Sequence, residues 1–275
     1  MGYRNMGKKL SILCMVVICA FLTAGCSSSK KIIPEEKPAG EVPSQLEQKN
    51  GTTAENDPAD EAGEVKNEEK SQEKTAYITV DDGPSRNNTV SILDTLKRNG
   101  IKATFFVLPK ANMDDIYRRI INEGHVLGNH SYSHARRIYS SAEDFEKDLL
   151  KAKAFIYEKF DYTTTVFRFP GGTKGRKKSI IQKRAEILKR NGYRYFDWDV
   201  SVADTDPNLK NYGDEKAVIN LMVKNVGNNT KGKKQLIVLM HDSSGKTCTA
   251  RALPHIIKEL QKQGYIFDVL TNYKE

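Results

Sequence analysis

The sequence has few cysteines. Only four occur in 275 residues, and two of them, Cys14 and Cys19, lie in an apolar N-terminal segment. Cys26 closes that segment, and Cys248 stands alone in the rest of the chain. This pattern excludes a disulfide framework, so the fold must be held together by packing.

The N-terminal apolar run is too short for a typical membrane span. Leu10 to Leu22 follows basic residues, and Leu22-Thr-Ala-Gly-Cys26 closes it. This arrangement resembles the bacterial lipoprotein signal, in which Cys26 becomes the lipidated first residue of the mature chain. We expect residues 1–26 to be a lipoprotein-type signal peptide. Because Thr23 stands where Leu is commoner, an uncleaved anchor is the alternative, and either one holds the protein at the outer face of the cell membrane.

Residues 27–75 lack apolar periodicity and are poor in large apolar side chains, so they predict a disordered tether. Residues 76–275 are long enough for one well-buried domain. That domain carries about 11 more basic than acidic residues, which favours an anionic partner. It lacks an aromatic-and-basic nucleic-acid signature. We therefore expect a cell-envelope polymer as partner, and no nucleic acid.

The domain alternates helices and strands. Four glycines each follow a helical pattern and precede an apolar run: Gly100, Gly124, Gly192 and Gly264. Seven strands are predicted, near 77–80, 103–108, 125–129, 166–169, 194–200, 235–240 and 265–270. Strand–helix alternation predicts an α/β fold with a parallel sheet, and strands that are apolar throughout indicate that both faces are covered. The pattern leaves open a doubly wound sheet or a closed barrel.

Residues with acidic, basic or metal-binding side chains follow these strands. In either architecture, functional groups gather beyond the carboxyl ends of the strands. The residues there are Asp81 and Asp82, His130 and His134, Arg168 to Gly172, Asp199 to Asp204, and His241 and Asp242. Isolated Asp-Gly-Pro is ordinary turn chemistry, but this clustering favours a site.

His130 and His134 are four residues apart and can share a metal. The Glu that zinc proteases carry after the first histidine is lacking, because Ser131 stands there. With Asp82 the set becomes two histidines and one carboxylate, which leaves open coordination positions typical of a catalytic site. Asp81 then stays free as a general base toward water. Since strand neighbours point opposite ways, both carboxylates reach one site only if a turn begins at Asp82.

Three further strand ends supply candidate groups. Arg168 could orient Asp81, or form a salt bridge at the rim. Pro170 and Gly171 belong to a Pro-Gly-Gly segment that frees backbone N–H groups for a developing oxyanion. His241 could protonate a leaving amine, with Asp204 or Asp199 setting its pKa, or it could be a satisfied core histidine.

Five ordered motifs resemble the polysaccharide deacetylase family, carbohydrate esterase family 4, also called the NodB-homology domain. They are Thr79-Val-Asp-Asp-Gly-Pro84, His130-Ser-Tyr-Ser-His134, Arg168-Phe-Pro-Gly-Gly172, Asp199 to Asp204 after Trp198, and Leu239-Met-His241. The resemblance covers about residues 76–271. It implies a distorted seven-stranded (β/α) barrel as a single catalytic domain, and metal-dependent removal of acetyl groups from N-acetylated sugars.

The resemblance also implies a role for each residue. Asp81 would be the base, Asp82, His130 and His134 the metal ligands, Arg168 the residue that orients the base, and His241 the acid. Asp204 would tune His241, Leu239 would line the acetyl-methyl pocket, and the Gly171 N–H would serve the oxyanion. Val80 replaces the usual Phe, which is a packing change. Gly171 and Thr205 replace the usual Tyr and Trp, so the walls of the sugar groove differ from the family pattern.

These residues predict a deacetylase that acts on N-acetylglucosamine in cell-wall peptidoglycan and releases acetate. The expected cofactor is Zn²⁺, with Co²⁺, Mn²⁺ or Fe²⁺ also suited to the ligands. The expected state is a monomer, anchored to the membrane through an N-terminal lipid. The same chemistry on N-acetylmuramic acid, exopolysaccharide or acetyl-xylan is the alternative, as is a silent wall-binding domain. An iron oxygenase would fit the ligands but not the strand–helix alternation.

Overall fold

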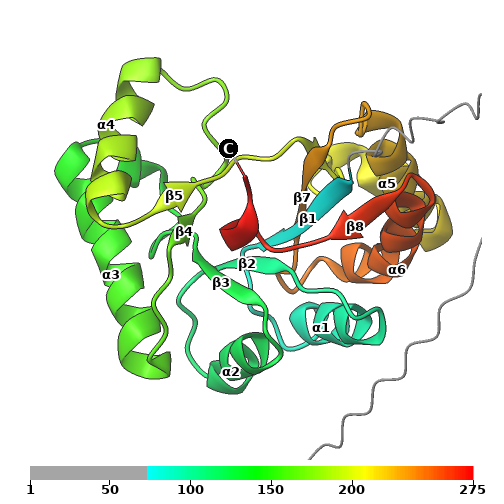
Figure 1. Cartoon of the computed structure of the whole chain (residues 1–275), viewed down its shortest axis with the longest axis horizontal. Helices are drawn as coiled ribbons and strands as arrows, with labels where there is room; N and C mark the ends of the chain where they lie inside the picture. The colour runs from blue at the N-terminus through cyan, green and yellow to red at the C-terminus, as the bar shows by residue number, and fades with distance from the viewer. Residues whose placement is uncertain (1–72, 275) are drawn as a thin grey trace, which may run out of the picture. The chain divides into compact units, whose positions relative to one another are not determined.

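The computed structural model describes residues 73–274, which form a parallel sheet flanked by helices (Figure 1). Hydrogen bonds join seven strands in the order β5-β4-β3-β2-β1-β7-β6, and β8 pairs with the start of β1. The strands are β1 (Lys74–Asp81), β2 (Thr104–Val107), β3 (Val126–Asn129), β4 (Val166–Phe167), β5 (Arg194–Tyr195), β6 (Val200–Ser201), β7 (Gln235–His241) and β8 (Tyr265–Phe267). The predicted signal peptide with Cys26, and nearly all of the predicted tether, lie outside the described residues.

Six α-helices connect the strands of the described region. They are α1 (Asn88–Arg98), α2 (Asp114–Asn122), α3 (Ala142–Phe160), α4 (Lys178–Arg190), α5 (Glu215–Asn229) and α6 (Thr247–Lys262). The predicted helix ends are confirmed, because Gly100, Gly124, Gly192 and Gly264 have φ between +66° and +82°. None of the helices in residues 73–274 is both long and apolar enough to cross a membrane.

The strands bury both faces, as their apolar runs predicted. Ile78 and Val80 of β1 pack outward against the helices, in a core shared with α1, α5 and α6. Tyr77, one residue away, packs inward with Phe106 of β2 and Ile237 of β7. Because side chains alternate along a strand, the inward positions that follow Tyr77 are Thr79 and Asp81. The strand period therefore places Asp81 inside the curve of the sheet.

The strand predicted at 194–200 is wrong as a single element. Residues 194–195 pair with β4, residues 200–201 pair with β7, and four residues separate the two strands. The backbone carbonyls of Phe196 and Asp197 in that gap accept hydrogen bonds from Arg168 instead of from a neighbouring strand. The buried guanidinium of Arg168 thus binds the backbone carbonyl groups that a continuous strand would use to pair with its neighbour.

This break also decides the architecture. β5 and β6 are the two ends of the sheet order, yet residues 196–199 alone connect them. An extended chain of that length spans at most about 17 Å, so the sheet must curl until its two ends approach each other. The fold is an α/β curled half-barrel, which confirms the predicted distorted (β/α) barrel over the open doubly wound sheet.

Candidate metal centre and active site

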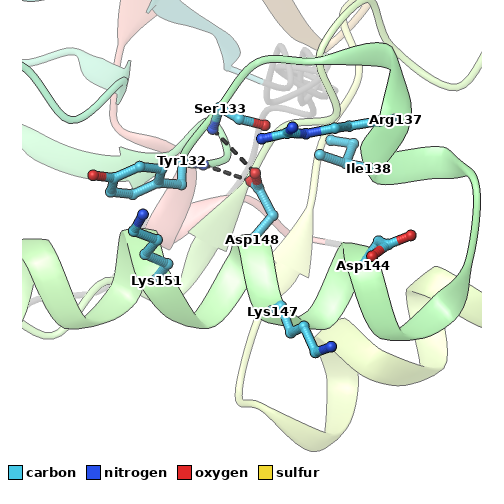
Figure 2. Close-up of a pocket in the computed structure, with 8 residues that line it drawn as sticks. All are labelled: Tyr132, Ser133, Arg137, Ile138, Asp144, Lys147, Asp148 and Lys151. Carbon is cyan, nitrogen blue, oxygen red and sulfur yellow. Dashed lines mark hydrogen bonds between the residues drawn. The ribbon is translucent and has the colours of Figure 1, made fainter. Parts of the chain in front are cut away.

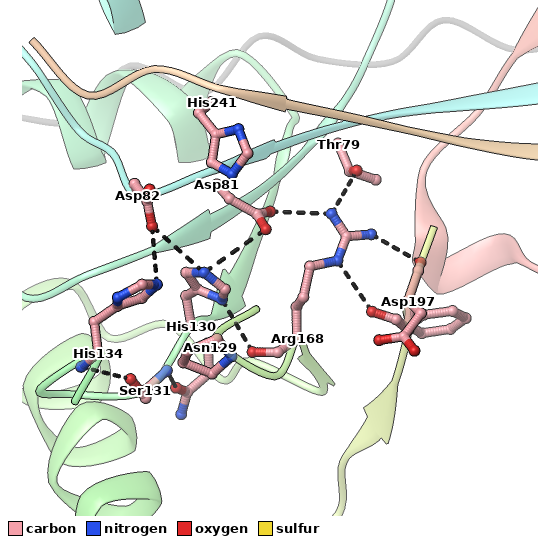
Figure 3. Close-up of polar contacts among 12 residues, drawn as sticks. Thr79, Asp81, Asp82, Asn129, His130, Ser131, His134, Arg168, Asp197 and His241 are labelled. Atoms are coloured by element: carbon pink, nitrogen blue, oxygen red, sulfur yellow. Dashed lines mark hydrogen bonds and ion pairs between the residues drawn. The ribbon is translucent and has the colours of Figure 1, made fainter. Parts of the chain in front are cut away.

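The carboxyl ends of four strands bring the predicted site residues together (Figure 3). Asp81 ends β1, His241 ends β7, Arg168 follows β4, and His130 follows β3. Each lies two or four residues after an inward-facing core residue of its own strand. Those core residues are Tyr77, Ile237, Val166 and Val126, so all four site side chains point inside the curled sheet. The clustering predicted from strand ends is therefore present.

Asp82, His130 and His134 form a group that could hold a metal ion. One ligand atom from each residue lies within 4.8 Å of the others. Asp82 Oδ1 is 3.5 Å from His130 Nε2 and 3.3 Å from His134 Nε2. That oxygen is buried and accepts no hydrogen bond from any described residue. A buried carboxylate oxygen faced by two imidazole nitrogens has the donor set of a divalent cation site.

Protonation in this group suits metal binding. Burial raises the pKa of Asp82, but the neighbouring imidazole of His130, with His241 and His134, outweighs it and lowers the pKa to about 2. Burial, together with the neighbouring His130, lowers the pKa of His134. A charged carboxylate and a neutral imidazole are the forms that bind metals.

The predicted turn at Asp82 is confirmed. Asp82 has a φ of +75°, directly after β1 ends at Asp81. This left-handed conformation is uncommon outside glycine, and it reverses the alternation that would have sent the Asp82 side chain outward. Gly83 is required next, because a Cβ there would lie 2.3 Å from Oδ2 of the buried Asp242. The turn thus delivers two adjacent carboxylates to one site.

His130 is oriented through its second ring nitrogen. His130 Nδ1 lies 3.0 Å from the backbone oxygen of Arg168. Because that oxygen can only accept, Nδ1 carries the proton and Nε2 is left with its lone pair toward Asp82. The loop after β4 therefore sets the tautomer that the metal needs.

Asp148 of α3 holds the loop between the two histidines, a contact that the sequence did not reveal. Its carboxylate accepts the backbone N–H groups of Tyr132 at 2.6 Å and Ser133 at 3.1 Å (Figure 2). The next N–H, of His134, donates to Ser131 Oγ at 2.9 Å. Ser131 and His134 both have positive φ, so the loop is strained and depends on these bonds.

Replacing Asp148 should weaken metal binding. We expect Asp148→Asn to lower the affinity of the protein for Zn²⁺ by about 10- to 100-fold, because the loop that carries His134 loses a charged double acceptor. Calorimetric titration of the metal-free protein measures this. Glu143→Gln, an exposed change on the same helix, is the control. Equal affinities in all three proteins would contradict the role of Asp148.

Asp81 and Arg168 form a buried pair. Arg168 is fully buried, and its Nη1 donates to Asp81 Oδ1 at 3.0 Å and to Thr79 Oγ1 at 2.6 Å. The guanidinium carbon also lies 4.3 Å from the centre of the Phe106 ring. Of the two interpretations of Arg168, the residue that orients Asp81 is supported and the salt bridge at the rim is not. Thr79 was missed, although its place two residues before Asp81 could have indicated it.

His241 pairs with Asp204. His241 Nδ1 lies 2.9 Å from Asp204 Oδ1, and Asp204 Oδ2 accepts a hydrogen bond from the backbone N–H of His241 at 2.8 Å. Asp199, the other candidate, instead contacts Lys233 and the backbone N–H of Ile237. Burial lowers the pKa of His241, but Asp204, then Asp81 and Asp82, outweigh it and raise the pKa above its usual value. His241 is thus suited to be a proton donor.

The raised pKa of His241 predicts the direction in which activity changes with pH. An acid must carry its proton, so activity falls as pH rises through the pKa of His241. Asp204→Asn removes the largest favourable influence on the protonated ring, so we expect the alkaline limb of the kcat/KM profile to move to lower pH. Asp206→Asn, on the same loop, is the control. An unmoved alkaline limb in Asp204→Asn would show that His241 is not the group that titrates.

Gly171, Pro170 and Leu239 lie where the sequence placed them. Gly171 is exposed with a φ of +72°, and no described residue accepts its N–H. Pro170 is buried beside it. Leu239 is buried on β7, two residues before His241 and on the same side of the strand. Their contacts with an acetyl group remain predictions.

Comparison with known proteins identifies the family. The polysaccharide deacetylase profile matches residues 68–196. A peptidoglycan-N-acetylglucosamine deacetylase of Bacillus cereus is 35% identical over 208 residues, which cover 74% of this chain and 90% of that protein. The chain belongs to the polysaccharide deacetylase family. Its members are metal-dependent hydrolases of C–N bonds in amides, so the predicted family and enzyme class are confirmed.

Two further matches bear on fold and substrate. The crystal structure of the polysaccharide deacetylase Bc1974 from Bacillus cereus superimposes with a TM-score of 0.62 at 29% identity, over 74% of this chain and 93% of that one. The peptidoglycan-N-acetylmuramic acid deacetylase PdaA of Bacillus subtilis is 30% identical over 198 residues, which cover 71% of this chain and 70% of PdaA. The family of this deacetylase therefore includes relatives named for either amino sugar of the wall.

Proposed function

We propose that this deacetylase removes the N-acetyl group from N-acetylglucosamine in cell-wall peptidoglycan and releases acetate. The observation that carries the proposal is the position of Asp81. Asp81 Oδ2 lies 3.7 Å from His130 Nε2 of the metal group, while Arg168 holds its other oxygen. One oxygen of the Asp81 carboxylate thus faces the candidate metal site, and His241, which can carry a proton, lies at the same end of the sheet.

The residues of this chain can carry out amide hydrolysis. A divalent cation held by Asp82, His130 and His134 would polarise the acetyl carbonyl and make the attacking water more acidic. Asp81 accepts the proton of that water as it attacks the carbonyl carbon. The Gly171 N–H donates to the oxygen on which negative charge develops. His241 then gives its proton to the departing sugar nitrogen, so acetate and a free amine result.

The metal is proposed to be Zn²⁺. Two imidazoles and one carboxylate suit zinc in a catalytic site, and they also suit Co²⁺, Mn²⁺ or Fe²⁺. The proposed substrate rests on the relatives that are named as peptidoglycan deacetylases. N-Acetylmuramic acid is the second candidate, because PdaA is also similar.

The proposed location follows from the N-terminal sequence. A lipidated Cys26 after a signal peptide of residues 1–26 would hold the chain at the outer face of the cell membrane. The predicted tether, 27–75, is shortened by the structure, because β1 begins at Lys74. Residues 27–73 would be the tether that lets the catalytic domain reach the wall glycan. We propose that the protein acts there as a monomer.

Acetate release from purified peptidoglycan by the full chain tests this function. We expect release that a chelator abolishes and added Zn²⁺ restores. Mass analysis of the muropeptides then names the deacetylated sugar, and a mass loss on N-acetylmuramic acid alone would favour the second candidate. Tight wall binding without acetate release under any of the four metals would contradict the enzyme and favour a silent binding domain.

A further inference from the structure

A basic groove lies beside the metal group. A cavity of about 420 Å³ is lined by His134, Ala135, Arg136, Tyr139, Pro170, Gly171 and Arg176. It begins at a proposed metal ligand and passes the backbone proposed to bind the oxyanion. Two arginines and no carboxylate line it, so any group that binds there meets positive charge.

Arg176 is fixed in this groove. Its Nε donates to the oxygen of Gly172 at 2.8 Å and its Nη2 to the oxygen of Pro170 at 2.9 Å. Its guanidinium lies over the Tyr139 ring, 3.8 Å from the ring centre. No described residue accepts a hydrogen bond from Nη1. The arginine therefore has a set orientation and a free donor before any ligand arrives, which lowers the entropic cost of binding.

Gly171 lies against this arginine. A Cβ at Gly171 would be in ordinary contact with Arg176 Nη2, at 3.4 Å, but the φ of +72° disfavours any side chain there. The groove thus has a guanidinium beside Gly171.

No ion pair with another described residue neutralises the two arginines of the groove. Neither Arg136 nor Arg176 has an ion pair with another described residue, and the segment 174–178 adds three exposed lysines: Lys174, Lys177 and Lys178. Asp197, which follows β5, accepts the N–H and the hydroxyl of Thr173. A surface of this kind recruits an anion.

We propose that this groove binds a carboxylate carried by the substrate glycan next to the sugar that loses its acetyl group. This inference rests on the proposed function and makes the substrate an anionic glycan. The planar fork of an arginine matches a carboxylate, and a contact beside the metal would fix the register of the sugar chain. The carboxylate has two possible sources: the lactyl group of an unsubstituted N-acetylmuramic acid, or the peptide attached to a substituted one.

Binding to metal-free full-length protein tests the inference without turnover. The probes are glycan strands freed of peptide, glycan strands that keep their peptides, and neutral N-acetylglucosamine oligomers of equal length. We expect Arg176→Gln to weaken binding of carboxylate-bearing glycan by about tenfold, and to leave the neutral oligomer unchanged. The strand type that loses affinity identifies the source of the carboxylate. Arg176→Lys should recover part of the affinity, because it restores the charge but not the fork.

Two controls keep the test decisive. Arg190→Gln removes an exposed arginine of α4 outside the groove and should change no affinity. Arg136→Gln removes the second groove arginine, and it replaces Arg176→Gln if that variant does not fold. Equal weakening for charged and neutral glycans would show that Arg176 only supports the loop. No weakening of either glycan, or no binding of either by the unmodified protein, would overturn the inference.

Failure of the inference is separable from failure of the proposed function. Acetate release from charged and neutral glycans with equal KM would overturn the carboxylate subsite and leave the deacetylase intact. Carboxylate-dependent binding without acetate release from any glycan would keep the subsite and contradict the enzyme.

Discussion

Asp81→Asn should lower kcat by about 10²- to 10⁴-fold, the usual contribution of a general base. Asparagine keeps the size and the acceptor oxygen that face Arg168, but it cannot take a proton from water. Asp81 is not one of the three proposed metal ligands, so the variant should still bind one equivalent of metal. Steady-state kinetics on peptidoglycan, together with metal analysis of the same samples, measures both quantities.

The control for Asp81→Asn is another aspartate paired with an arginine. Asp115 contacts Arg86 on the exposed surface, so Asp115→Asn should leave kcat unchanged. A thermal melt separates lost chemistry from lost folding, because Asp81→Asn also removes the charge opposite the buried Arg168. Full activity of Asp81→Asn would contradict the mechanism.

Arg168→Met should destabilise the fold by about 3–5 kcal/mol, the cost of breaking a buried ion pair. Methionine fills much of the volume but donates nothing. The buried Asp81 carboxylate would lose its counter-charge, and the carbonyls of Phe196 and Asp197 would lose their donor. Denaturant unfolding of both proteins measures the change in the free energy of unfolding, and kcat should fall as Asp81 loses its orientation.

An exposed arginine–carboxylate pair supplies the matched control for Arg168→Met. Arg190 contacts Glu146 at the surface, where water screens the pair, so Arg190→Met should barely change the free energy of unfolding. The double variant Asp81→Asn/Arg168→Met should lose less stability than the two single changes together, because the partners interact directly. Additive losses would show that the buried pair is not a coupled unit.

The candidate metal site was predictable from local patterns. Two histidines four residues apart, together with a carboxylate at a strand end, predict the three ligands. Their positions after parallel strands predict that the three residues lie close together. Alternation along β1 also places Asp81 inside the sheet, because a strand sends every second side chain to one face. The helix ends could also be predicted, because the left-handed backbone conformation at those positions favours glycine.

Other features depended on contacts between distant segments. The residues alone left Asp199 and Asp204 open as the partner of His241, although the family resemblance implied Asp204. The choice rests on the pairing of β6 with β7, which brings the loop after β6 beside the end of β7. The sequence could not show that strand 194–200 breaks, because Arg168, at least 28 residues earlier, takes the carbonyls in the gap. It also gave no sign that Asp148 holds the loop between the histidines.

The sequence by itself determined the strand–helix alternation, the helix ends and the candidate reacting groups, because these depend on neighbours within a few residues. Only the tertiary structure decided that Arg168 interrupts the strand at 194–200, that Asp148 holds the loop between the histidines, and that Arg176 lies beside Gly171. These depend on where the curl of the sheet brings separate loops together. Such contacts are set by packing over the whole domain and leave no periodic signal in the chain.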